Sequence, residues 1–268
     1  DNDGIGNNAD TDDDDDGVAD SDDVFPFDPQ EWSDSNGDGI GDNYEQERAL
    51  LTTIYSSLGG EGWLSNYGWK NTSDHCEWYG VICTGRLVRG LSLGSNNLSG
   101  EIPQDIGSFL AIEWIQLQKN RITGSIPDSL SKLGSIQSLL LYDNQLYGSL
   151  PQDIGQARNL QAIFVHNNLL EGVSLSSIRE FNKLKSRLLY QTRVRLKVLE
   201  LIDGMPELSS IWISDNQFDG EIPSEVGSWP EIQFIYIDNN QFTGSLPDSI
   251  TQLGKLKRML LADNKFGG

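Results

Sequence analysis

The sequence is poor in the residues that most enzymes and membrane proteins depend on. It contains only two cysteines and two histidines in 268 residues, and its first 45 residues contain no lysine or arginine. No apolar run approaches the roughly 18 residues that suggest a membrane-spanning helix. A net charge of −21 argues against nucleic acid as a partner, because phosphate contact requires a basic surface. No serine–histidine–aspartate order, glycine-rich phosphate loop or H-E-x-x-H motif occurs, so the sequence does not indicate an enzyme.

The acidic residues are concentrated at the start of the chain. Residues 1–45 carry 17 Asp and Glu, whereas the rest of the chain carries 23 acidic and 19 basic residues. A free acidic tail or a metal-binding segment would each give this asymmetry, and the spacing of the acidic residues must decide between them.

Three stretches of this acidic segment fit one metal-binding template. A calcium loop of the EF-hand kind places side-chain ligands at positions 1, 3, 5, 9 and 12, a glycine at position 6 and a backbone carbonyl at position 7. Residues 34–45 and 12–23 fit, and residues 1–10 fit if the first ligand precedes them. The candidate ligands are Asp1, Asp3, Asn7 and Asp10; Asp12, Asp14, Asp16, Val18, Asp20 and Asp23; and Asp34, Asn36, Asp38, Ile40, Asp42 and Glu45. We therefore expect Ca²⁺ to order this segment, the alternative being a disordered acidic tail.

The loop spacing, together with the proline-containing stretch 24–29, resembles thrombospondin type 3 calcium repeats. The resemblance covers roughly residues 1–43. It implies an irregular wrap of chain around a string of calcium ions, with little apolar core.

The rest of the chain repeats with a period of 24 residues. The repeated pattern is L-x-x-L-x-L-x-x-N-x-L-x-G, often followed by Ile-Pro or Leu-Pro. Its asparagines are Asn96, Asn120, Asn144, Asn168, Asn216, Asn240 and Asn264. Alternating apolar residues indicate the inward side of a short strand, and each coil can bury its apolar edge only against its neighbours. The pattern therefore predicts an α/β solenoid, a curved array of coils with a parallel β-sheet on its concave face.

One coil is degenerate. The frame predicts an asparagine at position 192, where Thr192 stands, and a core leucine at position 187, where Arg187 stands. We expect a distorted coil here, with a one-residue shift as one possibility. Seven basic residues between 179 and 197 indicate either solvated charges or a functional basic patch.

The repeat resembles the plant-type leucine-rich repeats of receptor ectodomains and polygalacturonase inhibitors. The resemblance covers residues 88–268 as eight coils, the last incomplete, and residues 46–87 resemble the N-terminal cap of that family after a calcium-binding segment at 1–45. Two cysteines alone fit a reduced protein or a single bridge. The resemblance to the cap favours a Cys76–Cys83 disulfide and a secreted or cell-surface location.

The frame also predicts which side chains face the concave side. They lie four and two residues before each repeat asparagine, flanked by residues six before it. Among them are aromatic or ring-bearing residues that we expect to bind a ligand: Trp114, Tyr142, Phe164, His166, Tyr190, Trp212, Phe234 and Tyr236. Exposed aromatics along one face are typical of a contact surface for protein or glycan. Packing of these rings against one another is the alternative.

These features favour a binding or adhesion module for a protein or glycan, with calcium as the cofactor and no enzymatic activity. A structural subunit of a self-associating extracellular assembly is the second hypothesis. The chain starts inside a calcium loop and ends just after a repeat asparagine, so we expect it to be a piece of a longer protein.

Overall fold

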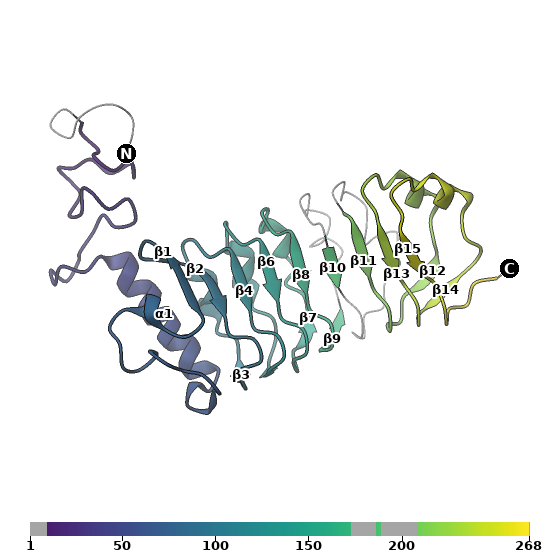
Figure 1. Ribbon diagram of the computed structural model, residues 1–268, viewed down its shortest axis with the longest axis horizontal. Helices are drawn as coiled ribbons and strands as arrows, with labels where there is room; N and C mark the ends of the chain where they lie inside the picture. The colour runs from purple at the N-terminus through teal and green to yellow at the C-terminus, as the bar shows by residue number, and fades with distance from the viewer. Residues whose placement is uncertain (1–9, 173–185, 189–207, 268) are drawn as a thin grey trace.

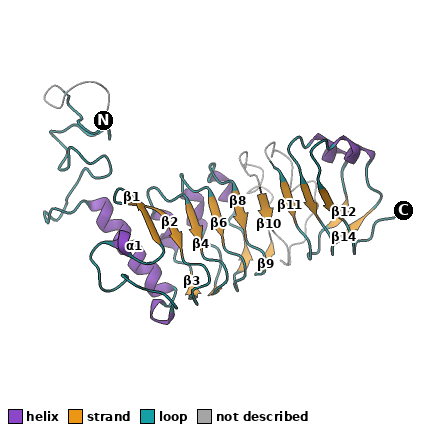
Figure 2. Cartoon of the chain, in the orientation of Figure 1, coloured by secondary structure: helices purple, strands orange, loops and turns teal. Residues whose placement is uncertain are grey.

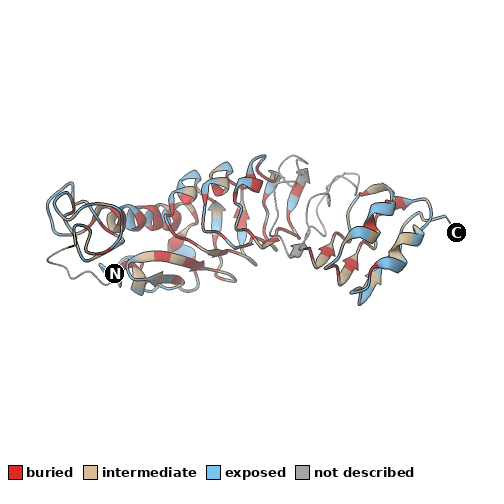
Figure 3. Cartoon of the chain, turned by 90° about the horizontal axis from the view of Figure 1, so that it is seen from above, coloured by how far each residue is buried: buried red, intermediate tan, exposed pale blue. Residues whose placement is uncertain are grey.

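The computed structural model describes residues 10–172, 186–188 and 208–267. An irregular acidic segment leads into a helical cap, and a row of coils follows along the length of the molecule (Figure 1). Buried residues run along the inside of the cap and the coils (Figure 3). Within the described residues, no helix combines the length and apolarity needed to cross a membrane.

The cap is built around helix α1 (Asp42–Ser57), whose buried face carries Leu50, Leu51, Ile54 and Tyr55. This spacing of three and four residues puts the apolar side chains on one side of the helix. The cap also contains the short 3₁₀ helices η1 (Gly60–Gly62) and η2 (His75–Glu77) and the antiparallel strands β1 (Val81–Thr84) and β2 (Leu87–Ser92). Helix α1 begins three residues before the end of the acidic segment, so the last acidic loop runs into the helix.

A cluster of aromatic rings fills the cap. Trp69 lies 5.0 Å from both Trp63 and Trp78 between ring centroids, and Tyr55 lies 5.1 Å from Trp63. All four side chains are buried. The cluster covers the apolar end that the first coil would otherwise expose to water.

One long sheet crosses the cap and the solenoid, and Figure 2 shows its strands side by side. After β1 and β2 its order is β4, β6, β8, β10, β11, β13 and β15, all parallel from β2 onward. The bounds of these strands are β4 (Trp114–Gln116), β6 (Ser138–Leu140), β8 (Ala162–Phe164), β10 (Ser186–Leu188), β11 (Ser210–Trp212), β13 (Phe234–Tyr236) and β15 (Arg258–Leu260). The middle residues of β4, β6, β8, β11 and β13 are at most 3% exposed, which confirms the predicted inward positions.

The opposite side of each coil carries shorter elements. Two-stranded parallel sheets pair β3 (Ser99–Glu101) with β5 (Arg121–Thr123), β7 (Tyr147–Ser149) with β9 (Leu169–Gly172), and β12 (Asp219–Glu221) with β14 (Gln241–Thr243). The 3₁₀ helices are η3 (Gln104–Ser108), η4 (Asp128–Lys132), η5 (Ile154–Gln156), η6 (Ser224–Ser228) and η7 (Asp248–Gln252). A proline precedes η3, η4, η6 and η7 directly, because its fixed φ suits the residue before a helical turn and it needs no hydrogen-bond partner for an N–H.

The repeat asparagines hold consecutive coils together through the backbone. The Asn144 carbonyl oxygen accepts from Ile122 N at 3.0 Å, and its amide donates to Leu117 O at 2.9 Å and Leu141 O at 3.0 Å. Asn168 makes the equivalent bonds one coil later. Each asparagine therefore binds backbone groups of its own coil and of the preceding one.

The degenerate coil keeps the frame where it is described. In β10, Arg187 pairs with Ile163 on one side and Ile211 on the other, each 24 residues away. A one-residue shift, which the sequence left open, is therefore wrong for this strand. Thr192, Tyr190 and most of the basic stretch 179–197 lie outside the described residues.

Candidate calcium loops and the concave surface

The second acidic loop brings its carboxylates together. The side chains of Asp12, Asp14 and Asp16 each offer an oxygen, and these oxygens lie within 4.8 Å of one another. Left-handed backbone at Asp15 and Gly17, with φ of 61° and 93°, turns the chain around this point. Local loop geometry therefore produces the cluster that the spacing predicts.

The carboxylates of this loop share one pattern of hydrogen bonding. One oxygen of each accepts from a backbone N–H: Asp12 from Gly17, Asp14 from Asp16, Asp16 from Val18, and Asp23 from Phe25. The second oxygen of each is buried and has no hydrogen-bond partner within the described part of the chain. Asp10 is the last ligand expected for the first loop. One of its carboxylate oxygens accepts from Asp12 N, and the other is buried without a hydrogen-bond partner within the described residues.

Two of these carboxyl groups are deeply buried. Asp14 and Asp23 are each only 9% exposed. Burial raises the pKa of the Asp14 carboxyl, and the neighbouring Asp16, Asp23 and Asp12 charges add to the rise. Ionised oxygens that are shielded from water and lack a partner destabilise the folded segment. A hard divalent cation bound by oxygen would offset that cost, and Ca²⁺ prefers this donor set.

The third loop is closed by a contact between its early and late positions. The Asn36 amide donates to a Glu45 carboxylate oxygen at 2.9 Å, and Glu45 lies in the first turn of α1. Asp34 accepts from the Gly37 and Gly39 amides, which shapes the turn. Asp42 accepts from both Ser33 and Ser35, and these hydrogen bonds lower the pKa of its carboxyl.

Of the first-loop candidates, Asp1, Asp3 and Asn7 lie outside the described residues. In the second loop Asp20 accepts from Asp13 N at 2.8 Å, and Val18 is half-buried. In the third loop Asp38 accepts from Ile40 N at 2.9 Å.

A junction that sequence reasoning missed attaches this segment to the cap. The fully buried Glu31 carboxylate accepts from Asn43 N at 3.1 Å and Tyr44 N at 2.7 Å. These two N–H groups lie in the first turn of α1, where the helix itself offers no acceptor. Gln30 accepts from Arg86 N at 2.8 Å and donates to Thr84 O at 3.2 Å, in the turn between β1 and β2. The third loop and the cap therefore share both a helix and a set of buried contacts.

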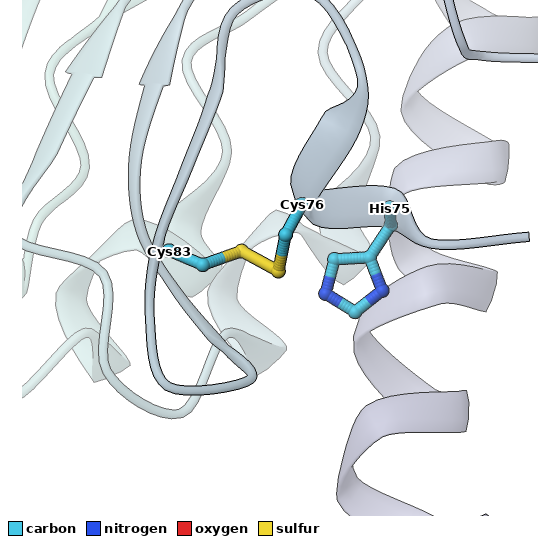
Figure 4. A group of neighbouring side chains, drawn as sticks. All are labelled: His75, Cys76 and Cys83. Atoms are coloured by element: carbon cyan, nitrogen blue, oxygen red, sulfur yellow. A yellow bond between two sulfur atoms is a disulfide. The ribbon is translucent and has the colours of Figure 1, made fainter. Parts of the chain in front are cut away.

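The predicted disulfide is confirmed, with Cα atoms of Cys76 and Cys83 5.6 Å apart. His75 lies beside it (Figure 4) and is fully buried. Its Nε2 lies 3.2 Å from Arg86 O, and its ring lies 4.3 Å from that of Tyr44. His75, Cys76 and Cys83 are close enough to suggest a metal group, but both sulfur atoms are committed to the bridge.

The concave face carries a column of large side chains in register. Leu140 pairs with Phe164 across β6 and β8, and Tyr236 pairs with both Trp212 and Leu260 across β11, β13 and β15. These side chains are half-buried, or 43% exposed in the case of Leu260. We call Leu140, Phe164, Trp212, Tyr236 and Leu260 the concave column.

Aromatic rings pack against one another at the end of the column. Trp212 and Tyr236 lie 4.6 Å apart between ring centroids, edge to face, and Phe234 lies 6.3 Å from Tyr236. The Lys257 ammonium lies 5.9 Å from the centroid of the Phe234 ring. The alternative of ring packing therefore applies to Trp212, Tyr236 and Phe234, and ligand binding by these residues stays a prediction.

Two of the expected ligand-binding residues are used differently. His166 is only 5% exposed and its ring stacks on Tyr142, with centroids 4.5 Å apart, so the expectation of an open His166 is wrong. The Trp114 indole lies over Gly90, where even a β-carbon would collide with it. Trp114 thereby covers strand β2 and stays half-buried.

Burial of His166 predicts a pH-dependent stability. Desolvation lowers the pKa of its imidazole from 6.5 to about 4, and the Asp143 carboxylate opposes this shift. The folded protein therefore binds a proton at His166 more weakly than the unfolded chain does. The contribution of neutral His166 to the free energy of unfolding is complete above pH 6.5 and is lost as the pH falls toward 4. Because solvent screens part of this effect, we expect the free energy of unfolding to fall by about 2 kcal/mol between pH 7 and pH 4.

The measurement is the thermal midpoint of the wild type and of His166→Phe between pH 7 and pH 4. Phenylalanine keeps the stack on Tyr142 but does not titrate, and the acidic loops titrate equally in both proteins. A difference between the two proteins that stays constant over this range would contradict the prediction.

A second polar row beside the asparagines also escaped sequence reasoning. The residue before each described repeat asparagine has left-handed backbone, as at Asp143, Asn167, Asp215 and Asn239 with φ between 52° and 55°. The Asn239 amide donates to Asp215 at 2.8 Å, and Asn167 donates to Asp143 in the same way. The enrichment of Asp and Asn at this position, which tolerate such backbone, was the available signal.

Two family models match the chain. A leucine rich repeat N-terminal domain matches residues 45–84, and the leucine rich repeat matches residues 88–109, 111–133, 207–229 and 231–253. The first match runs from α1 to the end of β1, and the second covers two coils on each side of the degenerate coil.

Similar proteins come from Arabidopsis thaliana. The leucine-rich repeat receptor protein kinase EMS1 is 37% identical over 62 residues, which is 23% of this chain and 5% of that protein. The leucine-rich repeat protein FLOR 1 is 39% identical over 67 residues, which is 25% of this chain and 20% of that protein. The chain therefore matches only a small part of the length of these relatives.

Solved structures agree with the fold. The receptor kinase HAESA in complex with the peptide hormone IDA and the co-receptor SERK1 has a TM-score of 0.70 and 25% identity over 82% of this chain and 42% of that one. The plant peptide hormone receptor RGFR1 with RGF2 has a TM-score of 0.62 and 28% identity over 66% of this chain and 29% of that one. With its cap and its register of coils, this chain is an extracellular leucine-rich-repeat protein of the plant type.

Proposed function

We propose that this chain binds a protein or peptide ligand on its concave face and has no enzymatic activity of its own. The observation that carries this proposal is the concave column, whose large apolar side chains follow the sheet in register and remain partly open to water. Rows of this kind are typical of contact surfaces rather than of an exposed sheet, which is ordinarily polar.

The similar structures support a protein ligand over a glycan. HAESA and RGFR1 were solved with a peptide hormone and with RGF2. On the present chain, polar groups flank the apolar column, as in the hydrogen bond from Ser214 to Asp238 at 2.6 Å. An apolar centre with a polar rim is the usual anatomy of a protein interface.

We further propose that the acidic segment binds Ca²⁺ through its three loops. The support is the set of buried carboxylate oxygens of Asp12, Asp14, Asp16 and Asp23, each left over after the other oxygen of its carboxylate accepts a backbone N–H. These residues would hold the ion, and the ion would supply the positive charge that lets neighbouring carboxylates lie close together. Calcium would then act as a structural cofactor of a stiff extension beside the cap.

Replacing Trp212 tests the concave surface. Trp212→Ala removes the edge-to-face contact with Tyr236 and a large part of the column. We expect affinity for the ligand to fall by about 2 kcal/mol, roughly thirtyfold, if Trp212 anchors the interface. Because Trp212 is half-buried, we also expect stability to fall, by about 1 kcal/mol.

The secreted chain is first applied to a peptide and a glycan array, and the strongest ligand is then titrated by calorimetry. Tyr147→Ala is the matched control, because Tyr147 is 51% exposed but lies in β7, outside the long sheet. Equal affinities of the two variants would refute the assignment of the surface. Light scattering without ligand decides whether the chain instead associates with itself.

A further inference from the structure

Two sequences in this chain fit the acceptor motif for N-linked glycans. The motif is Asn-x-Ser or Asn-x-Thr with any residue except proline in the middle, and it applies to proteins that pass through a eukaryotic secretory pathway. Here it occurs as Asn71-Thr72-Ser73 in the cap and as Asn97-Leu98-Ser99 in the first coil. The chain is extracellular, so both motifs are open to consideration, and the structure distinguishes between them.

Asn71 stands free on the surface of the cap. It is exposed, and within the described residues its side-chain amide has no hydrogen-bond partner. Its backbone is fixed by a hydrogen bond from Asn71 N to Gly68 O at 3.1 Å, and Ser73 is also exposed. A glycan at Asn71 would extend into solvent without breaking a contact of the folded protein.

Asn97 lies in a closed contact between the first coil and the cap. Its amide donates to Gly62 O at 2.8 Å, and the intervening Leu98 is fully buried. The Ser99 N–H donates to Leu58 O at 3.1 Å, so the backbone of this motif is tied to the cap, although the Ser99 side chain is exposed. A glycan on the Asn97 nitrogen would have to fit at the contact of this nitrogen with Gly62 O, between the first coil and the cap.

We propose that Asn71 carries an N-linked glycan in the secreted protein and that Asn97 does not. In the transfer, the Asn71 amide nitrogen bonds to the anomeric carbon of a lipid-linked oligosaccharide. The bond from that carbon to the lipid pyrophosphate breaks, the pyrophosphate leaves with the electron pair, and the amide nitrogen loses one proton.

The test is a site-resolved mass measurement on the full chain secreted from a eukaryotic cell line. Trypsin separates the two motifs, because Arg86 and Arg89 lie between them. Treatment with peptide-N-glycosidase should convert Asn71 to Asp and remove the glycan mass from that peptide, whereas the peptide with Asn97 should be unmodified throughout. Asn71→Gln and Ser73→Ala should each abolish the glycan, and Ser99→Ala should leave it in place.

A secreted, folded protein with unmodified Asn71 would overturn the proposal, and so would a glycan on Asn97. Far-ultraviolet circular dichroism of each variant shows that it has folded, so that loss of the glycan is not confused with loss of the fold. Ligand binding and calcium binding are measured separately, and neither result changes whether Asn71 carries a glycan.

Discussion

Removal of calcium is expected to make residues 10–41 sensitive to proteases while leaving the coils intact. Without the ion, the buried oxygens of Asp14 and Asp23 have no partner within the described residues, and the clustered carboxylates repel one another. The segment contributes little apolar burial to hold itself together, since Val24 and Phe27 are 57% and 72% exposed. The measurement is limited proteolysis with and without a chelator, with the cleavage sites mapped by mass spectrometry.

Two variants in the second loop sharpen this prediction. Asp14→Asn removes one charge from a buried carboxylate that faces the cluster, and we expect calcium affinity to fall about tenfold, or about 1.4 kcal/mol. Asp15→Asn removes the same charge one residue later, but Asp15 is exposed, so its effect should be threefold or less by screening. Calorimetric titration compares them. Equal affinities, or proteolysis unchanged by the chelator, would contradict the calcium assignment.

The junction at Glu31 extends the prediction to the cap. Because Glu45 lies on α1 and Glu31 accepts from the first amides of α1, an ion that orders the third loop should also stabilise the cap. A ligand at one hundred times its Kd stabilises the folded state by about 2.7 kcal/mol per site. Tryptophan fluorescence during thermal unfolding measures this, in a variant with Trp32, Trp114, Trp212 and Trp229 replaced by Phe, so that Trp63, Trp69 and Trp78 of the cap give the signal. A midpoint that calcium does not shift would show that the two parts are uncoupled.

Asn144→Ala is expected to destabilise the solenoid strongly. It removes the side-chain acceptor of Ile122 N and one of the two asparagine bonds accepted by each of Leu117 O and Leu141 O, at a position where Asn144 is 8% exposed. A buried backbone N–H without a partner costs about 1–3 kcal/mol and each further lost hydrogen bond about 1 kcal/mol, so we expect a total loss on the order of 3 kcal/mol. Since coils are stabilised only by their neighbours, the loss should spread along the array.

Denaturant unfolding followed by circular dichroism measures this loss. Asn159→Ala is the matched control, because the Asn159 amide donates to Gly134 O at 2.7 Å at the protein surface. We expect the control to lose about 1 kcal/mol or less. Asn144→Asp, which keeps the acceptor but loses the donor, should fall between the two. A loss at Asn144 no larger than that at Asn159 would refute a structural role for the asparagine row.

The sequence by itself determined the features that repeat. The 24-residue period placed Ile115, Leu139 and Ile163 inside the coils, and all three are at most 1% exposed. The asparagine positions and the recurring Ile-Pro and Leu-Pro steps follow from the same pattern, whereas the Cys76–Cys83 bridge was expected from the resemblance of residues 46–87 to a family cap. These features are readable because each depends on residues close in sequence, or on an identical neighbour one period away.

Only the tertiary structure decided how unlike residues meet. That His166 is buried beneath Tyr142, and that Trp114 covers Gly90, depends on which side chains happen to face each other 24 residues apart. The contact of Gln30 with Arg86 joins residues more than fifty apart and carries no periodic signal. The spacing of the acidic loops gave the ligand types, but the oxygens left over from backbone bonding become visible only when the chain is folded. Periodicity reports the repeated environment, whereas burial and pairing at one site depend on the particular neighbours assembled there.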